Sequence, residues 1–224
     1  MRAFRIVRGG YEAGADVQER SMLAGLARDV VLLLGSDVEH ESERRNQIVD
    51  PDDPLAALEA DVADIAEAIA AEENPAPVPP LDSAIQRLLP DMSEDPHEAG
   101  VLRELTENSV AAAKIENLVT FYQGLEALPP GNDVIFVPNE NAAAWMAALN
   151  DIRLVVAARL NITDDDSSAA VYARAGMFTG SHSRNADDLP VIETTDDMLA
   201  VLYTMTTWWQ DSLVTAVRNK AARR

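Results

Sequence analysis

Three side chains in residues 176–195 are of the types that form a hydrolase triad. They are Ser181, His182 and Asp187. A catalytic serine needs a turn that presents its hydroxyl to a base, and nearness in sequence does not supply that geometry. The serine lies in no nucleophile-elbow motif. We therefore interpret residues 176–195 as a long loop and predict that the protein is not an enzyme.

Two acidic clusters contain residue types that bind metals. The first has four carboxylates and one imidazole, at Asp37, Glu39, His40, Glu41 and Glu43. Their spacing fixes no coordination geometry and is typical of a solvated charge run. The second, residues 164–166, lacks the ligand spacing and the central glycine of a calcium loop. The absence of cysteine excludes disulfides, thiolate catalysis and Cys-ligated zinc. We expect neither a metal nor a cofactor.

The segment 141–160 is the element that we expect to organise the chain. It contains neither Pro nor Gly. Apolar residues at helical spacing run from Trp145 to Leu160 and predict a helix that is buried on most sides. Asn161 follows, and asparagine tolerates the left-handed conformation of a helix C-cap.

Polar side chains interrupt this helix at Asn150, Asp151 and Arg153. A buried charge costs several kcal/mol unless it is paired. We therefore expect a polar node, flanked by Trp145 and Arg159, whose members bond to each other, to the rest of the fold or to a docked partner. We favour the structural interpretation, and predict that Arg153→Ala leaves Asp151 or Asn150 unpaired.

The net charge of −20 is concentrated in residues 35–100, which hold 18 acidic and 3 basic residues. DNA affinity comes largely from Lys and Arg on phosphates, so nucleic acid is an improbable partner. The basic candidates are Arg2, Arg5 and Arg8, which we interpret as protection of a strand edge, and the C-terminal tail. Two lysines accompany sixteen arginines, which indicates codon bias.

The hydrophobic pattern predicts a mainly α fold, a multi-helix bundle with a small three-stranded sheet, in a single domain over residues 1–224. An N-terminal hairpin (3–13) and a strand near 134–137 form the sheet. Residues 36–52 and 74–80 are expected to be acidic or Pro-rich linkers. Helices are predicted over 15–34, 53–69, 81–89, 95–128, 141–160, 163–175 and from 195 onward.

Two predictions concern the faces of the long helices. For the helix over 95–128, helical spacing predicts a core face of Leu102, Leu105, Ala112, Ile115, Val119, Tyr122 and Leu125. Thr163 and Thr195 are expected to cap the last two helices. In the final helix Trp208 lies off the apolar stripe that contains Trp209, so we interpret it as a candidate exposed anchor.

The order of these features resembles a known family. The runs that carry the resemblance are RLLPDMSEDPHEAGVLRELTE, the segment WMAALNDIRLVVAARL at 145–160, and YTMTTWWQDSLV at 203–214. They resemble the actinobacterial domain-of-unknown-function family of AosR, an oxidative stress transcriptional regulator. The resemblance implies a cytoplasmic regulator that contacts the transcription machinery. Part of that family senses redox through thiols, and this chain departs from it because it has no cysteine.

The function predicted on this basis is transcriptional regulation of the oxidative stress response through contact with a sigma factor or RNA polymerase. Direct DNA binding is one alternative, and a non-catalytic adaptor or ligand-binding module is another. No apolar run approaches the roughly 18 residues of a membrane span, so we expect no membrane contact. The sequence leaves a homodimer open.

Overall fold

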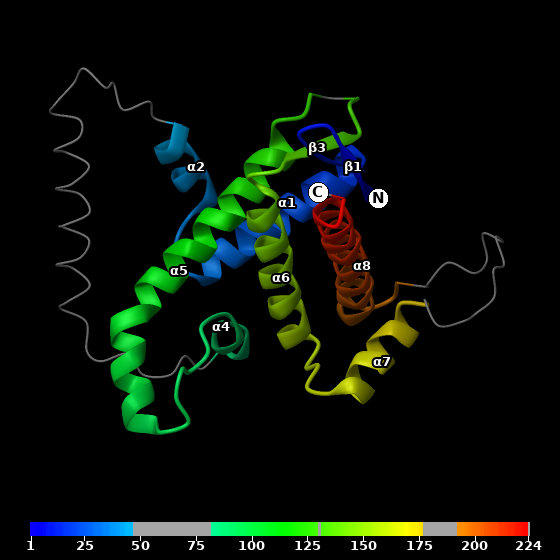
Figure 1. Cartoon of the computed structure of the whole chain (residues 1–224). Coiled ribbons are helices and arrows are strands. Elements are labelled where there is room, and N and C mark those ends of the chain that lie inside the picture. Colours follow the sequence, from blue (N-terminus) through cyan, green and yellow to red (C-terminus); the bar gives the residue numbers. More distant parts are fainter. Residues whose placement is uncertain (47–81, 130, 177–191, 224) are drawn as a thin grey trace, which may run out of the picture.

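The structure of this chain is a computed structural model, which describes residues 1–46, 82–129, 131–176 and 192–223 (Figure 1). The helices in these ranges are α1 (Val17–Leu33), α2 (Val38–Asn46), α4 (Ser83–Leu88), α5 (Pro96–Glu126), α6 (Ala142–Arg159), α7 (Asp165–Arg174) and α8 (Thr195–Ala221). The strands are β1 (Arg2–Val7), β2 (Gly10–Gly14) and β3 (Val134–Pro138). The predicted fold class, a mainly α bundle with a three-stranded sheet, is confirmed. The predicted helix over 53–69 and the linker 74–80 lie outside the described residues.

The sheet is antiparallel throughout, in the order β1-β2-β3. Gly9 has a φ of 83° in the turn between β1 and β2, a conformation that glycine adopts without steric cost. β3 pairs with β2 from Val134 to Pro138, so the strand predicted near 134–137 joins the hairpin as expected. This order leaves β1 at the edge of the sheet, beside α8 (Figure 1).

Four buried aromatic rings form the centre of the core. They come from four elements: Phe4 on β1, Phe121 on α5, Trp145 on α6 and Trp209 on α8. The closest ring centroids are 4.7 Å apart between Phe121 and Trp145, and 4.8 Å apart between Phe4 and Trp209. The indole N–H of Trp209 donates to the carbonyl of Arg2 at 3.2 Å. We define these four rings as the aromatic cluster, and it fixes the sheet to the helices.

α5 differs between its two halves. Its second half packs into the core through Leu118 and Phe121, whereas its first half extends away from the other long helices (Figure 1). Leu105, which the spacing places in the core face, is 73% exposed, and Ala112 is exposed as well. The predicted core face is therefore wrong at these two positions, because no long helix among the described residues covers that side of α5.

Three further predictions need correction. Residues 38–46 form α2 within the expected linker 36–52, and this helix is held to α5 by bonds such as Arg45 to Thr120 Oγ1 at 2.7 Å. α7 is capped by Asp164, and α8 by Thr194, each one residue away from the predicted cap. In both corrected caps the side-chain oxygen accepts the N–H of the third helical residue, which satisfies a free donor. Within the described ranges, no helix is both long and apolar enough to cross a bilayer.

The two glycines of α5 provide a test of the aromatic cluster. A Cβ on Gly124 would lie 2.6 Å from Trp145 Cζ2, whereas a Cβ on Gly100 would meet nothing within 4 Å. We expect Gly100→Ala to stabilise the protein by up to about 1 kcal/mol through helix propensity. Gly124→Ala should destabilise it by about 1–3 kcal/mol, because Trp145 must move within a packed core. Urea unfolding measures both changes; stabilisation by Gly124→Ala would show that the cluster tolerates displacement.

Candidate functional site

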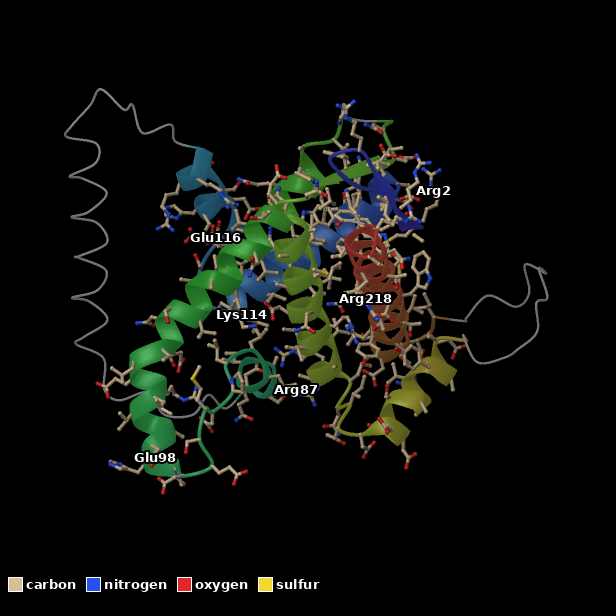
Figure 2. The ribbon with its side chains drawn as sticks, in the orientation of Figure 1. Arg2, Arg87, Glu98, Lys114, Glu116 and Arg218 are labelled. Carbon is tan, nitrogen blue, oxygen red and sulfur yellow. The ribbon has the colours of Figure 1, made fainter. Side chains whose placement is uncertain are left out.

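A buried ion pair joins α5 to α6. Lys114 Nζ on α5 (Figure 2) donates to Asp151 Oδ1 on α6 at 2.6 Å. Asp151 is only 2% exposed, whereas the Lys114 side chain is 21% exposed. Sequence reasoning selected Asp151 but missed its partner. The available signal was that Lys114 is one of only two lysines in the chain.

The carboxyl of Asp151 has a raised pKa. Burial is the main cause, because it penalises the charged form, and the hydrogen bond and charge of Lys114 offset it only in part. A buried carboxyl with a perturbed pKa is a candidate for acid–base chemistry only where it lines a cleft with other reactive groups. Here it faces an ammonium across a helix interface. Its contacts therefore assign it to the packing of α5 on α6.

Arg153 belongs to a different contact. Its Nε donates to Thr207 Oγ1 at 2.9 Å, its Nη1 donates to the amide oxygen of Gln210, and its guanidinium lies 5.8 Å from the ring centre of Tyr203. All three partners are on α8. The prediction that Arg153 pairs with Asp151 or Asn150 is therefore wrong. Residues two positions apart on a helix lie on different faces, so Asp151 faces α5 and Arg153 faces α8.

The remaining members of the predicted node are also separate. Asn150 is exposed. Arg159 lies at the other end of α6 and holds the carboxylate of Asp82 through two bonds of 2.8 Å. These bonds lower the pKa of Asp82, an effect to which its capping bond with the Ala84 N–H adds. Trp145 is buried in the aromatic cluster. Four of the five predicted residues, all except Asn150, thus hold α6 to its neighbours at several points, and the five do not form one node.

Trp208 is 41% exposed, as the sequence predicted, and its role as an anchor stays a prediction. It lies at one end of a groove of about 360 Å³ between α8 and the edge strand β1. The groove follows one face of α8 through Asp211 and Thr215 to Asn219, and β1 contributes Phe4 and Ile6. We define this feature as the β1–α8 groove.

An acidic projection forms a second surface, which sequence reasoning did not select. It comprises residues 91–107, the loop before α5 and its first turns, with Glu98 at the outer end in Figure 2. We define these residues as the acidic arm, which carries six carboxylates and one arginine. That arginine, Arg103, is buried and binds Asp91 at 2.5 Å and Glu107 at 3.0 Å. The other four carboxylates form no ion pair within the described residues.

Exposed apolar side chains accompany this negative charge. Leu105, Val101 and Met92 are 73%, 47% and 56% exposed. Val101 and Leu105 are one helical turn apart on α5, and Met92 Sδ accepts the hydroxyl of Thr106 at 3.7 Å. Because Leu105 is so exposed, its side chain contributes little to the packing of the free protein. The arm therefore combines an apolar contact area with uncompensated carboxylates.

The described residues add no support for the metal-binding clusters that were considered from the sequence. Among the described residues, no group of three His, Cys, Asp or Glu side chains is arranged to hold a metal ion. His40 lies in α2, where its backbone N–H donates to Asp37. The triad candidates Ser181, His182 and Asp187 lie outside the described residues. The surfaces that remain are the acidic arm and the β1–α8 groove.

Comparison with known proteins gives one match. Residues 1–217 match the model of a family described as a domain of unknown function, DUF2017. No curated protein and no solved structure matches the chain. The match covers every element from β1 to most of α8.

The Lys114–Asp151 pair yields a stability prediction. Lys114→Met leaves a buried carboxylate without its partner and should reduce the free energy of unfolding by about 3 kcal/mol. The double variant Lys114→Met with Asp151→Leu removes both charges, and should recover most of that loss because apolar groups replace the pair. Urea unfolding of both variants measures this difference. A double variant no more stable than the single one would contradict the assignment.

The raised pKa of Asp151 also predicts a pH dependence. The folded state binds this proton more tightly than the unfolded chain, whose carboxyl has an ordinary pKa of 3.8. The contribution of Asp151 to stability is therefore fully present below that value and is lost as the pH rises through the raised pKa. Relative to Asp151→Asn, the wild type should lose stability as the pH rises from the ordinary carboxyl pKa of 3.8 toward neutrality. Unfolding curves across this range measure the difference; a constant difference would contradict a raised pKa.

Proposed function

The chain belongs to the DUF2017 family, and we propose that it is a non-catalytic transcriptional regulator of the oxidative stress response that binds a basic protein surface. A sigma factor or RNA polymerase is the proposed partner. The observation that carries the proposal is the acidic arm, with Leu105 exposed among free carboxylates. The resemblance to the AosR family supports the regulatory part of the proposal.

In the free protein the arm holds the apolar side chains of Leu105, Val101 and Met92 in water. Exposed apolar side chains release free energy when a partner removes them from water, at about 25 cal/mol per Å². The carboxylates around them favour an approaching basic surface and repel an acidic one. Surfaces of sigma factors and polymerase that face DNA are basic, so they match the arm in charge. A basic helix that lies along the first half of α5 satisfies both requirements.

The charge distribution within the arm defines where contact occurs. Arg103 forms ion pairs with Asp91 and Glu107 and holds the loop against α5, so these residues give the arm its shape. Glu98 and Glu104 lie on the helix and form no ion pair within the described residues. The apolar side chain of Leu105 thus lies between a structural ion-pair cluster and carboxylates that form no ion pair among the described residues, although Glu98 accepts a hydrogen bond from Ser93.

Direct DNA binding is the second candidate, and one observation favours it. Arg2 lies on β1 and Arg8 in the hairpin turn. Arg218 on α8 and Arg223 just beyond it flank Lys220 in the sequence, and Lys220 Nζ binds the carbonyls of Val7 and Gly10 in the hairpin. In the part of the chain that the structure describes, none of the four has a carboxylate partner. Duplex DNA binding through these arginines would weaken steeply with salt. DNA binding is measured over a series of salt concentrations for the wild type and for an acidic arm variant. This measurement separates the two candidates, because the arm plays no part in DNA binding.

Leu105→Gln tests the proposed function. Binding of the purified protein to the RNA polymerase and sigma factors of its own host is measured by surface plasmon resonance. We expect Leu105→Gln to weaken this binding about tenfold or more, a loss of about 1.4 kcal/mol. Met198→Gln is the matched control, because Met198 is 48% exposed at the start of α8, away from the arm. Both variants should retain the unfolding free energy of the wild type, since exposed positions contribute little to it.

Two results would contradict the proposal. One is equal binding by Leu105→Gln and Met198→Gln, which would place the contact elsewhere. The other is an absence of binding to any polymerase or sigma subunit at low ionic strength, where attraction between opposite charges is strongest.

A further inference from the structure

We propose that the exposed face along the second half of α8 binds a second copy of this chain, with the two helices antiparallel about a two-fold axis. This surface is distinct from the acidic arm, and the proposal does not depend on the proposed function. We define the face as the α8 stripe, which consists of Trp208, Asp211, Thr215, Arg218, Asn219 and Ala222.

The α8 stripe is one continuous side of the helix. At about 100° per residue, its six positions fall within an arc of about 100° over about four turns. All six residues are exposed. The adjoining side of α8 is used within the chain: Ser212 Oγ accepts the N–H of Phe4, and the indole N–H of Trp209 donates to the backbone of β1. The stripe therefore lies beside the contact with β1 and is uncovered among the described residues.

The two charges of the stripe are not paired within the chain. Asp211 and Arg218 form no ion pair in the ranges that the structure describes. Neither has an opposite charge three or four residues away on α8, where a partner on the same helix would lie. The two are seven residues apart, which separates their backbones by about 10 Å along the helix axis. Both charges are thus available to another molecule.

A two-fold axis near Thr215 pairs these charges between two copies. In an isologous contact, a residue of one copy meets a second residue of the other copy, and the reverse contact forms as well. Antiparallel α8 helices related by an axis at this position bring Asp211 of each copy opposite Arg218 of the other. Two ion pairs therefore form on either side of the axis.

The same arrangement covers the exposed indole. Trp208 of each copy comes to lie opposite Asn219 and Ala222 of the other. Asn219 lines one end of the β1–α8 groove, so the indole enters the groove at that end. The small side chain of Ala222 leaves room for this large ring. Burial of an aromatic ring at an interface is a common source of binding free energy.

Charge complementarity favours a second copy over other occupants. The stripe has one acidic and one basic residue, so a ligand of a single charge sign cannot pair with both. Arg5, which also lines the groove, is already bound to Glu12 at 2.7 Å. A surface with the same two charges in the reverse order satisfies both, and the antiparallel second copy offers that surface.

The net charge of −20 opposes self-association at long range. The acidic arm, however, belongs to α5, and α6 lies between α5 and α8 (Figure 1). Exposed charges separated by more than about 8–10 Å are largely screened at physiological ionic strength. The stripe is about 21 Å long, which is short for an interface, because stable complexes bury about 1,600 Å² in total. We therefore expect a weak, reversible dimer.

Sedimentation velocity of the full chain measures this association at about 0.15 M salt, from about 1 µM to about 1 mM protein. Asp211→Arg and Arg218→Asp each place like charges opposite one another in a pair of identical copies. Each variant should therefore weaken the dimer by at least about tenfold. An equimolar mixture of the two variants should restore it, because one chain then has two basic residues in the stripe and the other has two acidic residues.

Further variants locate the contact. Trp208→Ala should weaken the dimer by about tenfold, whereas Met198→Ala, on the same helix but outside the stripe, should not. Circular dichroism shows that each variant keeps its fold. A wild type that stays monomeric at the highest concentration would overturn the proposal, and a monomeric mixture would overturn the antiparallel pairing. Loss of the dimer in Leu105→Gln with retention in Trp208→Ala would place the contact on the acidic arm instead.

Discussion

The contact of four aromatic rings is the constraint on which the rest of the structure depends. Phe4, Phe121, Trp145 and Trp209 come from segments that are far apart in the chain, and none of these elements could bury its ring alone. Aromatic pairs at these distances add about 0.5–1.5 kcal/mol each beyond the area that they bury. The sheet is too small to be stable by itself, so its attachment through Phe4 and the Trp209–Arg2 bond determines where β1 lies. That position in turn creates the β1–α8 groove.

The two lysines show how single cations support this arrangement. Lys114 joins α5 to α6, and Lys220 binds the carbonyls of Val7 and Gly10, the side chain of Asn139 and the face of Tyr11. A lysine ammonium is a compact charge with three donors that can point in different directions. An arginine's planar fork matches a carboxylate but not several carbonyls at once. The interpretation of the arginine excess as codon bias overlooked this: both lysines occupy positions that favour an ammonium.

Sequence reasoning found the elements more reliably than the contacts between them. Helical spacing predicted the burial of Trp145 and Trp209, and Asn161 does adopt a positive φ of 53° at the end of α6. The partners of Asn150, Asp151 and Arg153 could not be predicted from the sequence. These residues lie on different faces of α6, and which helix packs against each face depends on the tertiary positions of α5 and α8. The prediction of the core face of α5 was wrong at Leu105 and Ala112 for a related reason. Apolar residues occur on several sides of α5, and only the extension of its first half beyond the bundle decides that Leu105 is exposed while Phe121 is buried.

Because the first half of α5 extends beyond the bundle, the net charge of the chain is a poor guide to what each surface binds. α5 has 31 residues, so it is roughly 46 Å long at 1.5 Å per residue, with the acidic arm at one end and the aromatic cluster near the other (Figure 1). Exposed charges are screened over about 8–10 Å at physiological ionic strength. The carboxylates of the arm therefore have little effect at the hairpin, where Arg8 and Arg218 have no ion-pair partner among the described residues. A chain with a net charge of −20 thus presents a basic surface at one end and an acidic surface at the other. α5, anchored in the core by Phe121, keeps the two ends apart.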